Sequence, residues 1–268
     1  MKRIRVITTA GQKNPSARHF RWGAAALTAF AVIAAGCGTS SGGGGGSGSS
    51  SSASGSAAAS HTGGTFTILA NSSFGVADPA QNYTLEEWQL LINTHDGLTQ
   101  FKRVGGVEGT KIVPDLATAL PTPTDGGKTY LFHIRPGIKF SDGTTLKPSD
   151  FVRTFERQFT VPGPTSFYSG IVGADKCKAK KCDLSQGVVA DDSAMTLTIH
   201  LTAPDTEFFD KLALPFAYVV PGNTSFKLTG NDVPPGTGPY MWKSYDPNKA
   251  AVLVRNPYFK VWSKDAQP

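Results

Sequence analysis

The thiol groups of this 268-residue chain have a spacing that restricts their chemistry. Cys177 and Cys182 are separated by four residues within a lysine-rich segment. In an exported protein, two cysteines this close predict a disulfide that closes a small polar loop. A metal site is the alternative, but no histidine or further cysteine lies nearby to complete a tetrahedral set of ligands. We therefore expect a Cys177–Cys182 disulfide and no metal.

The remaining reactive side chains give no sign of catalysis. The histidines occur singly, without an H-E-x-x-H pattern or a cluster with cysteine. A G-x-S-x-G pattern and a G-x-G-x-x-G pattern do occur, but only inside a Ser/Gly repeat, where neither follows a strand nor opens a helix. We expect both to be accidents of composition. The sequence predicts no catalytic residue and no cofactor.

The positive charge of the chain is concentrated at its beginning. The formal net charge is +6, with 26 basic and 20 acidic residues. Six of the basic residues, and no acidic one, precede Cys37. Removing those six leaves 20 basic residues against the same 20 acidic ones, so the rest of the chain is formally neutral. This distribution argues against nucleic acid as a partner.

The basic beginning is followed by an uncharged apolar stretch, residues 22–36. Its 15 residues are fewer than the roughly 20 that a helix needs to span a bilayer. The pattern predicts a secretory signal peptide over residues 1–36. Ala34-Ala35-Gly36-Cys37 resembles the lipobox of bacterial lipoproteins, which implies lipid attachment at Cys37. An uncleaved anchor helix, or an ordinary signal with a coincidental cysteine, are the alternatives, and both also export the chain.

Residues 38–64 form a Ser/Gly tract, with 20 of 27 positions Ser or Gly and no charged side chain. Such a segment has almost no apolar surface to bury, so it should behave as a flexible chain with a reach of about 30 Å. We expect residues 37–64 to be a tether between a membrane anchor and the folded part, which begins near Thr65.

The folded part should be a mixed α/β structure. Thr84 and Glu87 form a capping box that predicts a helix through about Asn93. Ser149 is the expected N-cap of a second helix, whose apolar face we expect to be core. Alternating apolar residues and turn dipeptides predict the strands. These strands are 65–70, 98–103, 130–134, 138–140, 195–201, 238–242 and 251–255, with a short helix at 208–212.

An ordered series of short motifs runs through the folded part. It consists of PDLA at 114–117, YLFHIR at 130–135, KFSDG at 139–143 and DF at 150–151. ADPA at 77–80, DGL at 96–98, GTGPY at 236–240 and RNPY at 255–258 extend it on both sides. Together they resemble extracellular solute-binding proteins of family 5, the dipeptide, oligopeptide and nickel receptors of ABC importers.

The resemblance implies an α/β fold of the type II periplasmic-binding-protein kind, in which two lobes enclose a ligand. Members of the family are considerably longer than this chain. We therefore expect residues 65–268 to hold only most of lobe I, formed by about 65–115 and about 212–268, with an inserted subdomain at about 116–211. A fragment, a split gene or an early stop would each produce this arrangement.

The resemblance also implies the function. It indicates a non-enzymatic, monomeric receptor outside the membrane, held to the cell membrane by its lipid, which captures oligopeptides or similar solutes and delivers them to an ABC permease. The family also contains nickel, glycoside and opine binders, so the substrate class stays open. A secreted hydrolase and a structural or signalling lipoprotein of the same fold are the alternative functions.

The ligand-contacting residues are expected in the loop after the first strand, residues 71–83. Phe74, Asn82 and Tyr83 offer stacking and hydrogen-bonding groups suited to peptides. The alternative is that they are ordinary surface-loop residues. Trp242 is expected to take part in core or hinge packing instead.

Overall fold

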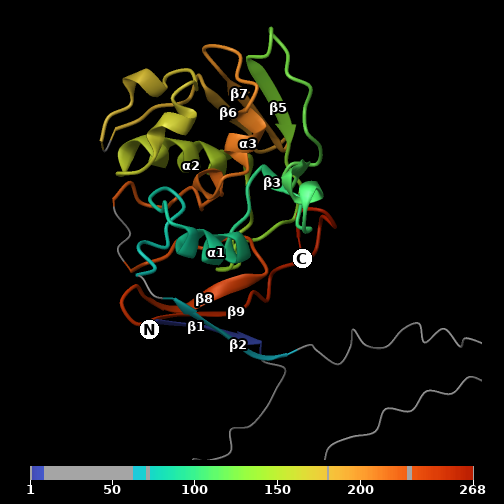
Figure 1. The fold of residues 1–268 in the computed structure, drawn as a ribbon. Coiled ribbons are helices and arrows are strands. Elements are labelled where there is room, and N and C mark those ends of the chain that lie inside the picture. The colour runs from blue at the N-terminus through green and yellow to red at the C-terminus, as the bar shows by residue number, and fades with distance from the viewer. Residues whose placement is uncertain (1, 9–62, 71–72, 180, 228–230, 268) are drawn as a thin grey trace, which may run out of the picture. The chain divides into compact units, whose positions relative to one another are not determined.

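The computed structural model describes residues 2–8, 63–70, 73–179, 181–227 and 231–267 (Figure 1). The first strand, β1, and the residues from Gly64 onward belong to one compact unit. The strands are β1 Lys2–Thr8, β2 Gly64–Ala70, β3 Thr99–Phe101, β4 Ile112–Pro114, β5 Thr129–His133, β6 Val188–Asp191, β7 Thr196–His200, β8 Tyr240–Asp246 and β9 Ala250–Arg255. The α-helices are α1 Leu85–Thr94, α2 Pro148–Thr160 and α3 Phe208–Leu212, and the short 3-10 helices are η2 Val107–Thr110, η3 Thr165–Tyr168, η4 Ala174–Lys176 and η5 Pro215–Ala217.

A four-stranded sheet in the order β2-β1-β9-β8 forms one layer. Strands β8 and β9 are antiparallel neighbours, with a bulge between Trp242 and Ser244. Helix α1 lies over β8 (Figure 1). Between them is a small core that contains Leu90 of α1 and Ala251 and Leu253 of β9. Trp242 packs against this core, as expected.

Strand β1 was not predicted from the sequence. It lies between β2, with which it is antiparallel, and β9, with which it is parallel. The run Lys2–Thr8 contains Ile4, Val6, Ile7 and Thr8, and such β-branched residues favour an extended backbone. Its lysine and arginines suggested a signal n-region, and the signal peptide at 1–36 stays a prediction. Cys37 and the Ser/Gly tract lie outside the described residues.

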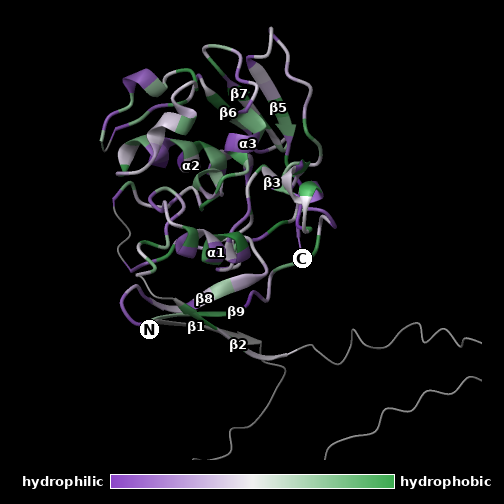
Figure 2. Cartoon of the chain, in the orientation of Figure 1, coloured by the Kyte–Doolittle hydropathy of each residue, from purple (hydrophilic) through white to green (hydrophobic). Residues whose placement is uncertain are grey.

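A second layer consists of the three-stranded sheet β5-β7-β6 and helix α2, which packs beside β6 (Figure 1). The alternation expected in this region is present, since Tyr130 and Phe132 of β5 are buried while Leu131 between them is exposed. Phe151 and Phe155 of α2 join them in the main hydrophobic core. Helices α1 and α2 alternate between hydrophilic and hydrophobic residues, as amphipathic helices do (Figure 2).

The start of α2 differs from the prediction. Lys147 is the N-cap, Pro148 is the first helical residue, and the Asp150 carboxylate accepts a hydrogen bond of 2.7 Å from the Lys147 backbone N–H. Ser149 lies one position inside the helix, where its hydroxyl and its backbone N–H both donate to the Asp192 carboxylate at 2.8 Å. Proline at the first helical position needs no hydrogen-bond acceptor for its nitrogen, which favours this start.

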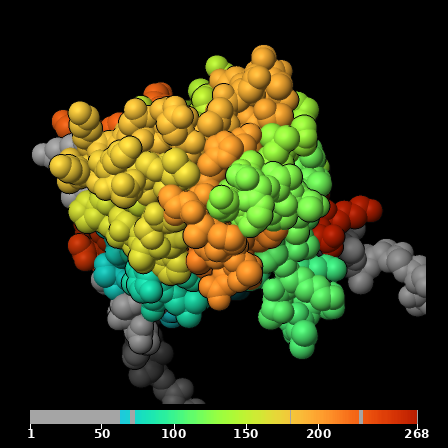
Figure 3. Space-filling model, turned by 90° about the horizontal axis from the view of Figure 1, so that it is seen from above, coloured from blue at the N-terminus to red at the C-terminus, as the bar shows by residue number. Residues whose placement is uncertain are grey.

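The predicted strand at 138–140 is wrong as well, because among the described residues it pairs only through an isolated bridge from Lys139 to Thr145. The tight turn at Asp142-Gly143 reverses the chain before a ladder can extend, and the Asp142 carboxylate accepts from the Thr144 backbone N–H at 2.9 Å. Further along the chain, Cys177 and Cys182 form a disulfide. Seen from above, the segments coloured green, yellow and orange, between β4 and α3, make up most of the visible face (Figure 3).

Candidate ligand-binding surface

Four aromatic side chains from three separate segments meet beside α1. Phe216 is at the centre, and the rings of Tyr83 and Phe167 stack on it with centroid distances of 5.8 and 5.5 Å. Trp88 of α1 meets Phe216 edge-on at 5.6 Å. We call Tyr83, Trp88, Phe167 and Phe216 the aromatic cluster.

The aromatic cluster is buried at its centre and open at one member. Phe216 has no exposed surface, Trp88 and Phe167 are partly buried, and Tyr83 is 67% exposed. A tyrosine that contacts protein through one ring face and solvent through the rest can stack a further flat group. Large exposed aromatic side chains beside buried ones are typical of binding surfaces.

Glu87 of α1 holds the loop that carries Tyr83. The predicted capping box is present, with the Glu87 N–H donating to the Thr84 hydroxyl at 3.3 Å. The Glu87 carboxylate also accepts from the backbone N–H groups of Val76 at 2.7 Å and Tyr83 at 2.8 Å. At Gly75, a Cβ would lie 1.6 Å from this carboxylate, so the loop can pass here only without a side chain. The motif that starts the helix therefore also shapes the loop.

A buried ion pair joins the same loop to α2. Both guanidinium NH groups of Arg157 donate to the Asp78 carboxylate, at 2.9 and 2.7 Å, and the Arg157 Nε donates to the Ser225 carbonyl at 2.7 Å. The two side chains are 1% and 0% exposed. Two parallel hydrogen bonds fix direction as well as distance, so this pair sets the position of the loop relative to α2.

A close backbone approach brings the segment that carries Phe167 to the loop. A Cβ at Gly163 would lie 2.1 Å from the carbonyl oxygen of Ala80, which is closer than any real contact. Three residues after Gly163 the chain is already in η3, which contains Phe167. Glycine at this position therefore allows the two halves of the aromatic cluster to meet.

Gly163→Ala should destabilise the protein and disturb the aromatic cluster. We expect a loss of about 1–3 kcal/mol in the free energy of unfolding, because the Ala80 carbonyl must move to admit the methyl group. Chemical denaturation followed by Trp fluorescence measures the loss. Gly170→Ala is the matched control, since a Cβ there meets nothing within 4 Å. Equal stability of the two variants would contradict the contact.

The three residues expected to contact ligand lie in different environments. Phe74 is fully buried with Leu90 and Leu253, so it cannot contact a ligand without leaving this core. Asn82 is 1% exposed and its amide donates to the Asp78 carbonyl at 2.9 Å, which makes it a support of the loop. Tyr83 belongs to the aromatic cluster and is exposed, so ligand contact stays a prediction for this residue.

The other members of the aromatic cluster were not singled out from the sequence. Trp88 lies on the predicted helix, at a position that the helical pattern treats as ordinary packing. Phe167 and Phe216 lie in the short 3-10 helices η3 and η5, which the sequence did not predict. Their contacts join residues up to 133 positions apart, from Tyr83 to Phe216. No local signal in the sequence contains such pairings.

Several buried polar atoms around the aromatic cluster have no hydrogen-bond partner among the described residues. They are Gln81 Oε1, Asn82 Oδ1, Trp88 Nε1 and Gln158 Oε1. Gln158 also donates through its amide nitrogen to the carbonyl of Phe216. An unpaired buried polar group costs about 1–3 kcal/mol, so a rearrangement or a bound molecule that supplies partners would be favoured here.

The GTGPY segment packs against the end of α1. A Cβ at Gly236 would lie 2.1 Å from the Thr94 carbonyl oxygen, and the Gly238 N–H donates to the same carbonyl at 3.0 Å. Between them, the Thr237 hydroxyl donates to the Asp96 carboxylate at 2.7 Å. The two glycines of the motif therefore allow a close approach of two backbones, and its threonine forms one buried hydrogen bond.

Two titratable groups are buried at this contact. Burial lowers the pKa of His95 from 6.5 to about 4, although Asp78 and the Pro234 carbonyl act in the opposite direction. Burial raises the pKa of Asp96 from 3.8 to about 6, against smaller lowering effects of Thr237 and Arg103. The His95 Nε2 lies 3.1 Å from the Pro234 carbonyl, which can only accept, so Nε2 carries the proton of the neutral ring.

Within the described ranges there is no group of three or more His, Cys, Asp or Glu side chains that could hold a metal ion. None of the helices in the described part of the chain combines the length and apolarity required for a membrane crossing. A partly open aromatic cluster on a mixed α/β scaffold is suited to bind a ligand, as the surface of a solute-binding protein does.

Comparison with known proteins places the chain within this class. Residues 111–268 match the family described as bacterial extracellular solute-binding proteins, family 5. The chain belongs to this family. Its members and the relatives below are binding proteins and not enzymes, and the fold is the one predicted from the sequence motifs.

Most of the relatives are named for peptides, and one is a probable deoxycholate-binding periplasmic protein of Escherichia coli (strain K12). The chain is 32% identical over 189 residues to a di/tripeptide-binding protein 1 of Pseudomonas aeruginosa (strain UCBPP-PA14), which covers 63% of this chain and 33% of the relative. It is 28% identical over 221 residues to the periplasmic oligopeptide-binding protein OppA of Escherichia coli (strain K12), covering 72% and 40%. The chain therefore spans only about a third of the length of the curated relatives it matches.

Solved structures show the same fold. A clavulanic acid biosynthesis oligopeptide binding protein 2 superposes with a TM-score of 0.64 and 25% identity, covering 73% of this chain and 36% of that one. The periplasmic murein tripeptide-binding protein MppA in its unliganded open form gives a TM-score of 0.59 and 26% identity, covering 71% and 37%.

Proposed function

We propose that this chain belongs to the substrate-binding component of an ABC importer, which captures peptides outside the membrane and delivers them to a permease. The observation that carries the proposal is the aromatic cluster, which ends in the exposed ring of Tyr83 on a family 5 fold. The names of the relatives support peptides as the substrate class.

The geometry suits one wall of a peptide site. Tyr83 offers a ring face for an apolar or aromatic side chain, and its loop is fixed by Glu87 and by the Asp78–Arg157 pair. A loop that is already ordered loses little conformational entropy when the ligand binds. A receptor for varied peptides requires a rigid scaffold that carries an open aromatic surface.

The location follows from the start of the chain. A signal peptide over residues 1–36 would export the chain, and its cleavage would remove β1 from the sheet of the precursor. Lipid attachment at Cys37 and a tether through residue 64 would then hold the receptor on the outer face of the cell membrane, where it can meet the permease. Globomycin-sensitive processing of the precursor, followed by mass spectrometry of the new N-terminus, tests this anchor. An unprocessed chain, or a mature chain without lipid at Cys37, would contradict it.

Tyr83→Ala should weaken peptide binding by about tenfold, which corresponds to the 1.4 kcal/mol expected when one stacking ring is removed from a binding site. Calorimetric titration of the full chain with short peptides that contain one Phe measures the change. Leu131→Ala is the control, because this side chain is also exposed but lies on β5, away from the aromatic cluster. Unchanged binding by Tyr83→Ala would contradict the site, and no binding of any peptide by the wild type would contradict the proposed function.

A further inference from the structure

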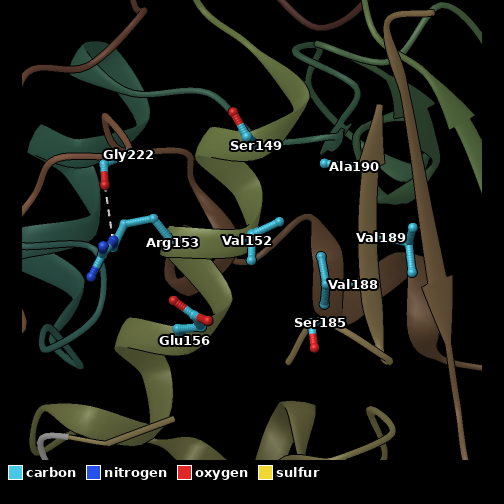
Figure 4. A pocket seen from close by; sticks show the side chains of 9 residues that line it. All are labelled: Ser149, Val152, Arg153, Glu156, Ser185, Val188, Val189, Ala190 and Gly222. Carbon is cyan, nitrogen blue, oxygen red and sulfur yellow. Dashed lines mark hydrogen bonds between the residues drawn. The ribbon is translucent and has the colours of Figure 1, made fainter. Parts of the chain in front are cut away.

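A pocket that no member of the aromatic cluster lines lies between helix α2 and strand β6 (Figure 4). Its volume is about 410 Å³. Val152, Arg153 and Glu156 line it from α2, Val188 and Ala190 line it from β6, and Gly222 borders it on the far side of α2 (Figure 4). We call it the α2–β6 pocket. None of these residues takes part in the surface described above.

Arg153 brings a positive charge to the pocket and is already held in place. Its Nε donates to the Gly222 carbonyl at 2.9 Å, the contact drawn in Figure 4. Its guanidinium carbon lies 3.9 Å from the ring centroid of Phe226. Within the described ranges, no carboxylate lies within the 4.0 Å of an ion pair with Arg153. Its two terminal NH₂ groups therefore remain able to grip a planar anion such as a carboxylate.

Glu156 brings a negative charge to the same pocket. Its carboxylate is partly buried, and this burial raises its pKa, with smaller lowering contributions from Arg153 and the Leu184 backbone. Among the residues that the structure describes, it forms no ion pair either. A desolvated carboxylate without a cation in contact gains when a ligand supplies one.

Both charged side chains line this pocket, and Arg153 acts on the Glu156 carboxylate without forming an ion pair with it in the described part of the chain. Arg153 and Glu156 are three positions apart on α2, which places their Cβ atoms about 5–6 Å from one another. A molecule that touches both must carry its own positive and negative groups close together. An α-amino acid has its ammonium and carboxylate on one carbon, whereas a peptide separates them along its backbone. Val152, Val188 and Ala190 leave an apolar wall for the side chain.

We propose that the α2–β6 pocket binds a free α-amino acid with a small branched apolar side chain. Arg153 receives the ligand carboxylate through its terminal NH₂ groups, and Glu156 accepts from the ligand ammonium. The side chain lies against Val152 and Val188. The site differs from the peptide surface in its residues and in the ligand that it selects.

Calorimetric titration of the full chain with L-valine tests the proposal. We expect saturable binding that Arg153→Gln and Glu156→Gln each weaken by about tenfold or more, the loss typical of one charged contact. Isobutylamine and isovalerate, which keep the valine side chain but lack one charge each, should bind at least tenfold more weakly, and so should L-valyl-L-valine. Lys249→Ala, which removes an exposed charge outside the pocket, should leave binding unchanged.

L-Valine binding by Glu156→Gln and by Tyr83→Ala separates the proposed site from a general disturbance of the fold. Arg153 also holds Gly222, so Arg153→Gln could disturb the fold, whereas Glu156→Gln keeps the shape of the side chain and is sufficient alone. Tyr83→Ala should bind L-valine as the wild type does, which separates this site from the peptide surface. Absence of binding at millimolar L-valine, or equal binding by the wild type and Glu156→Gln, would overturn the proposal.

Discussion

Asp78→Ala should lower the free energy of unfolding by about 3–5 kcal/mol, which is the loss expected when one partner of a buried ion pair is removed. The reason is the arginine that remains. Arg157 is 1% exposed in its side chain, so water cannot replace the two hydrogen bonds that it donates to Asp78. The variant therefore keeps a buried guanidinium that has no carboxylate at contact distance within the part of the chain that the structure describes.

Urea denaturation of the full chain, followed by circular dichroism, measures the loss. The double variant Asp78→Leu/Arg157→Met removes both charges and should be clearly more stable than Asp78→Ala, because no uncompensated charge is left inside. Lys249→Ala is the control for an ion pair in solvent. Lys249 is 83% exposed where it meets Asp246, so its loss should change stability by less than about 1 kcal/mol. If Asp78→Ala were as mild as Lys249→Ala, the pair would not hold the loop.

The same substitution links stability to the proposed function. Asp78 lies in the loop that ends in Tyr83, and Arg157 lies on α2. Without the pair, the loop loses its fixed position relative to α2, while Glu87 still holds its two ends. We therefore expect Asp78→Ala to weaken peptide binding even at temperatures where the protein is still folded, since the loop must then be ordered by the ligand.

Local patterns in the sequence were sufficient for much of the secondary structure. The capping box at Thr84 and Glu87 predicted α1 because both of its hydrogen bonds form within four residues. The alternation of Tyr130 and Phe132 predicted β5, because successive side chains of a strand point to opposite faces. Such signals depend on neighbours in the chain, so the sequence contains them directly.

Competing local signals produced the errors. At the start of α2, Ser149 is a favourable N-cap by residue type, yet Pro148 and Asp150 place the cap at Lys147. The hydroxyl of Ser149 then bonds to Asp192, which is 43 positions away and which no local rule includes. At β1 the basic residues predict an n-region, which stays a prediction, while the β-branched residues of the same run form a strand that was not predicted.

The binding surface depends on contacts that the sequence does not contain. Tyr83 was singled out by its residue type, but its ring position is fixed by Phe216, and its loop by an ion pair between residues 79 positions apart. Phe74 is also an aromatic residue that was expected to stack on a ligand. Its side chain lies in the core instead, because the loop turns inward before Gly75. Which aromatic residue faces solvent is decided by packing.

The motifs that indicated the family turn out to be structural in this part of the fold. Asp78 of ADPA forms the buried ion pair, Asp150 of DF caps α2, and the two glycines of GTGPY allow close contact with Thr94. Such motifs report how the scaffold is built. They therefore identify the fold strongly and the ligand weakly, which is why the division into lobe I and inserted subdomain, and the substrate itself, stay predictions.

Asp96→Asn should change how stability depends on pH, with a gain in stability relative to the wild type as pH rises. In the folded protein Asp96 keeps its proton up to about pH 6, whereas in the unfolded chain it loses it near pH 4. Since the folded state binds the extra proton between these values, Asp96 contributes stability that is lost as pH rises from about 4 through 6. Asparagine has no such proton. The variant should therefore gain about 3 kcal/mol relative to the wild type across this interval, at 1.36 kcal/mol per pKa unit.

Asp115 should enlarge this difference in stability between Asp96→Asn and the wild type. Burial raises its pKa, and the charge of Asp96 raises it further. Removing the charge of Asp96 lowers the pKa of Asp115 toward its ordinary value. The variant therefore also loses less stability through Asp115 than the wild type does as pH rises. Urea denaturation at pH steps from 4 to 7 measures the difference between the two proteins. Asp210→Asn, a change at an exposed aspartate, is the control and should give a curve parallel to the wild type. A constant difference between Asp96→Asn and wild type would show that Asp96 titrates normally in the folded state.

The contribution of His95 to stability depends on pH in the opposite direction to that of Asp96. Its folded pKa is about 4 against an ordinary 6.5, so the unfolded chain takes up a proton first as pH falls, and stability is lost from about pH 6.5 down to 4. This loss runs opposite to that of Asp96 and is of similar size, about 3 kcal/mol, so the two largely cancel in the wild type. In Asp96→Asn the His95 contribution is no longer offset by Asp96, and stability should rise with pH from 4 to 6.5. His95→Asn should show the reverse, a fall in stability as pH rises from 4 to 6, because only the aspartate contribution is then left.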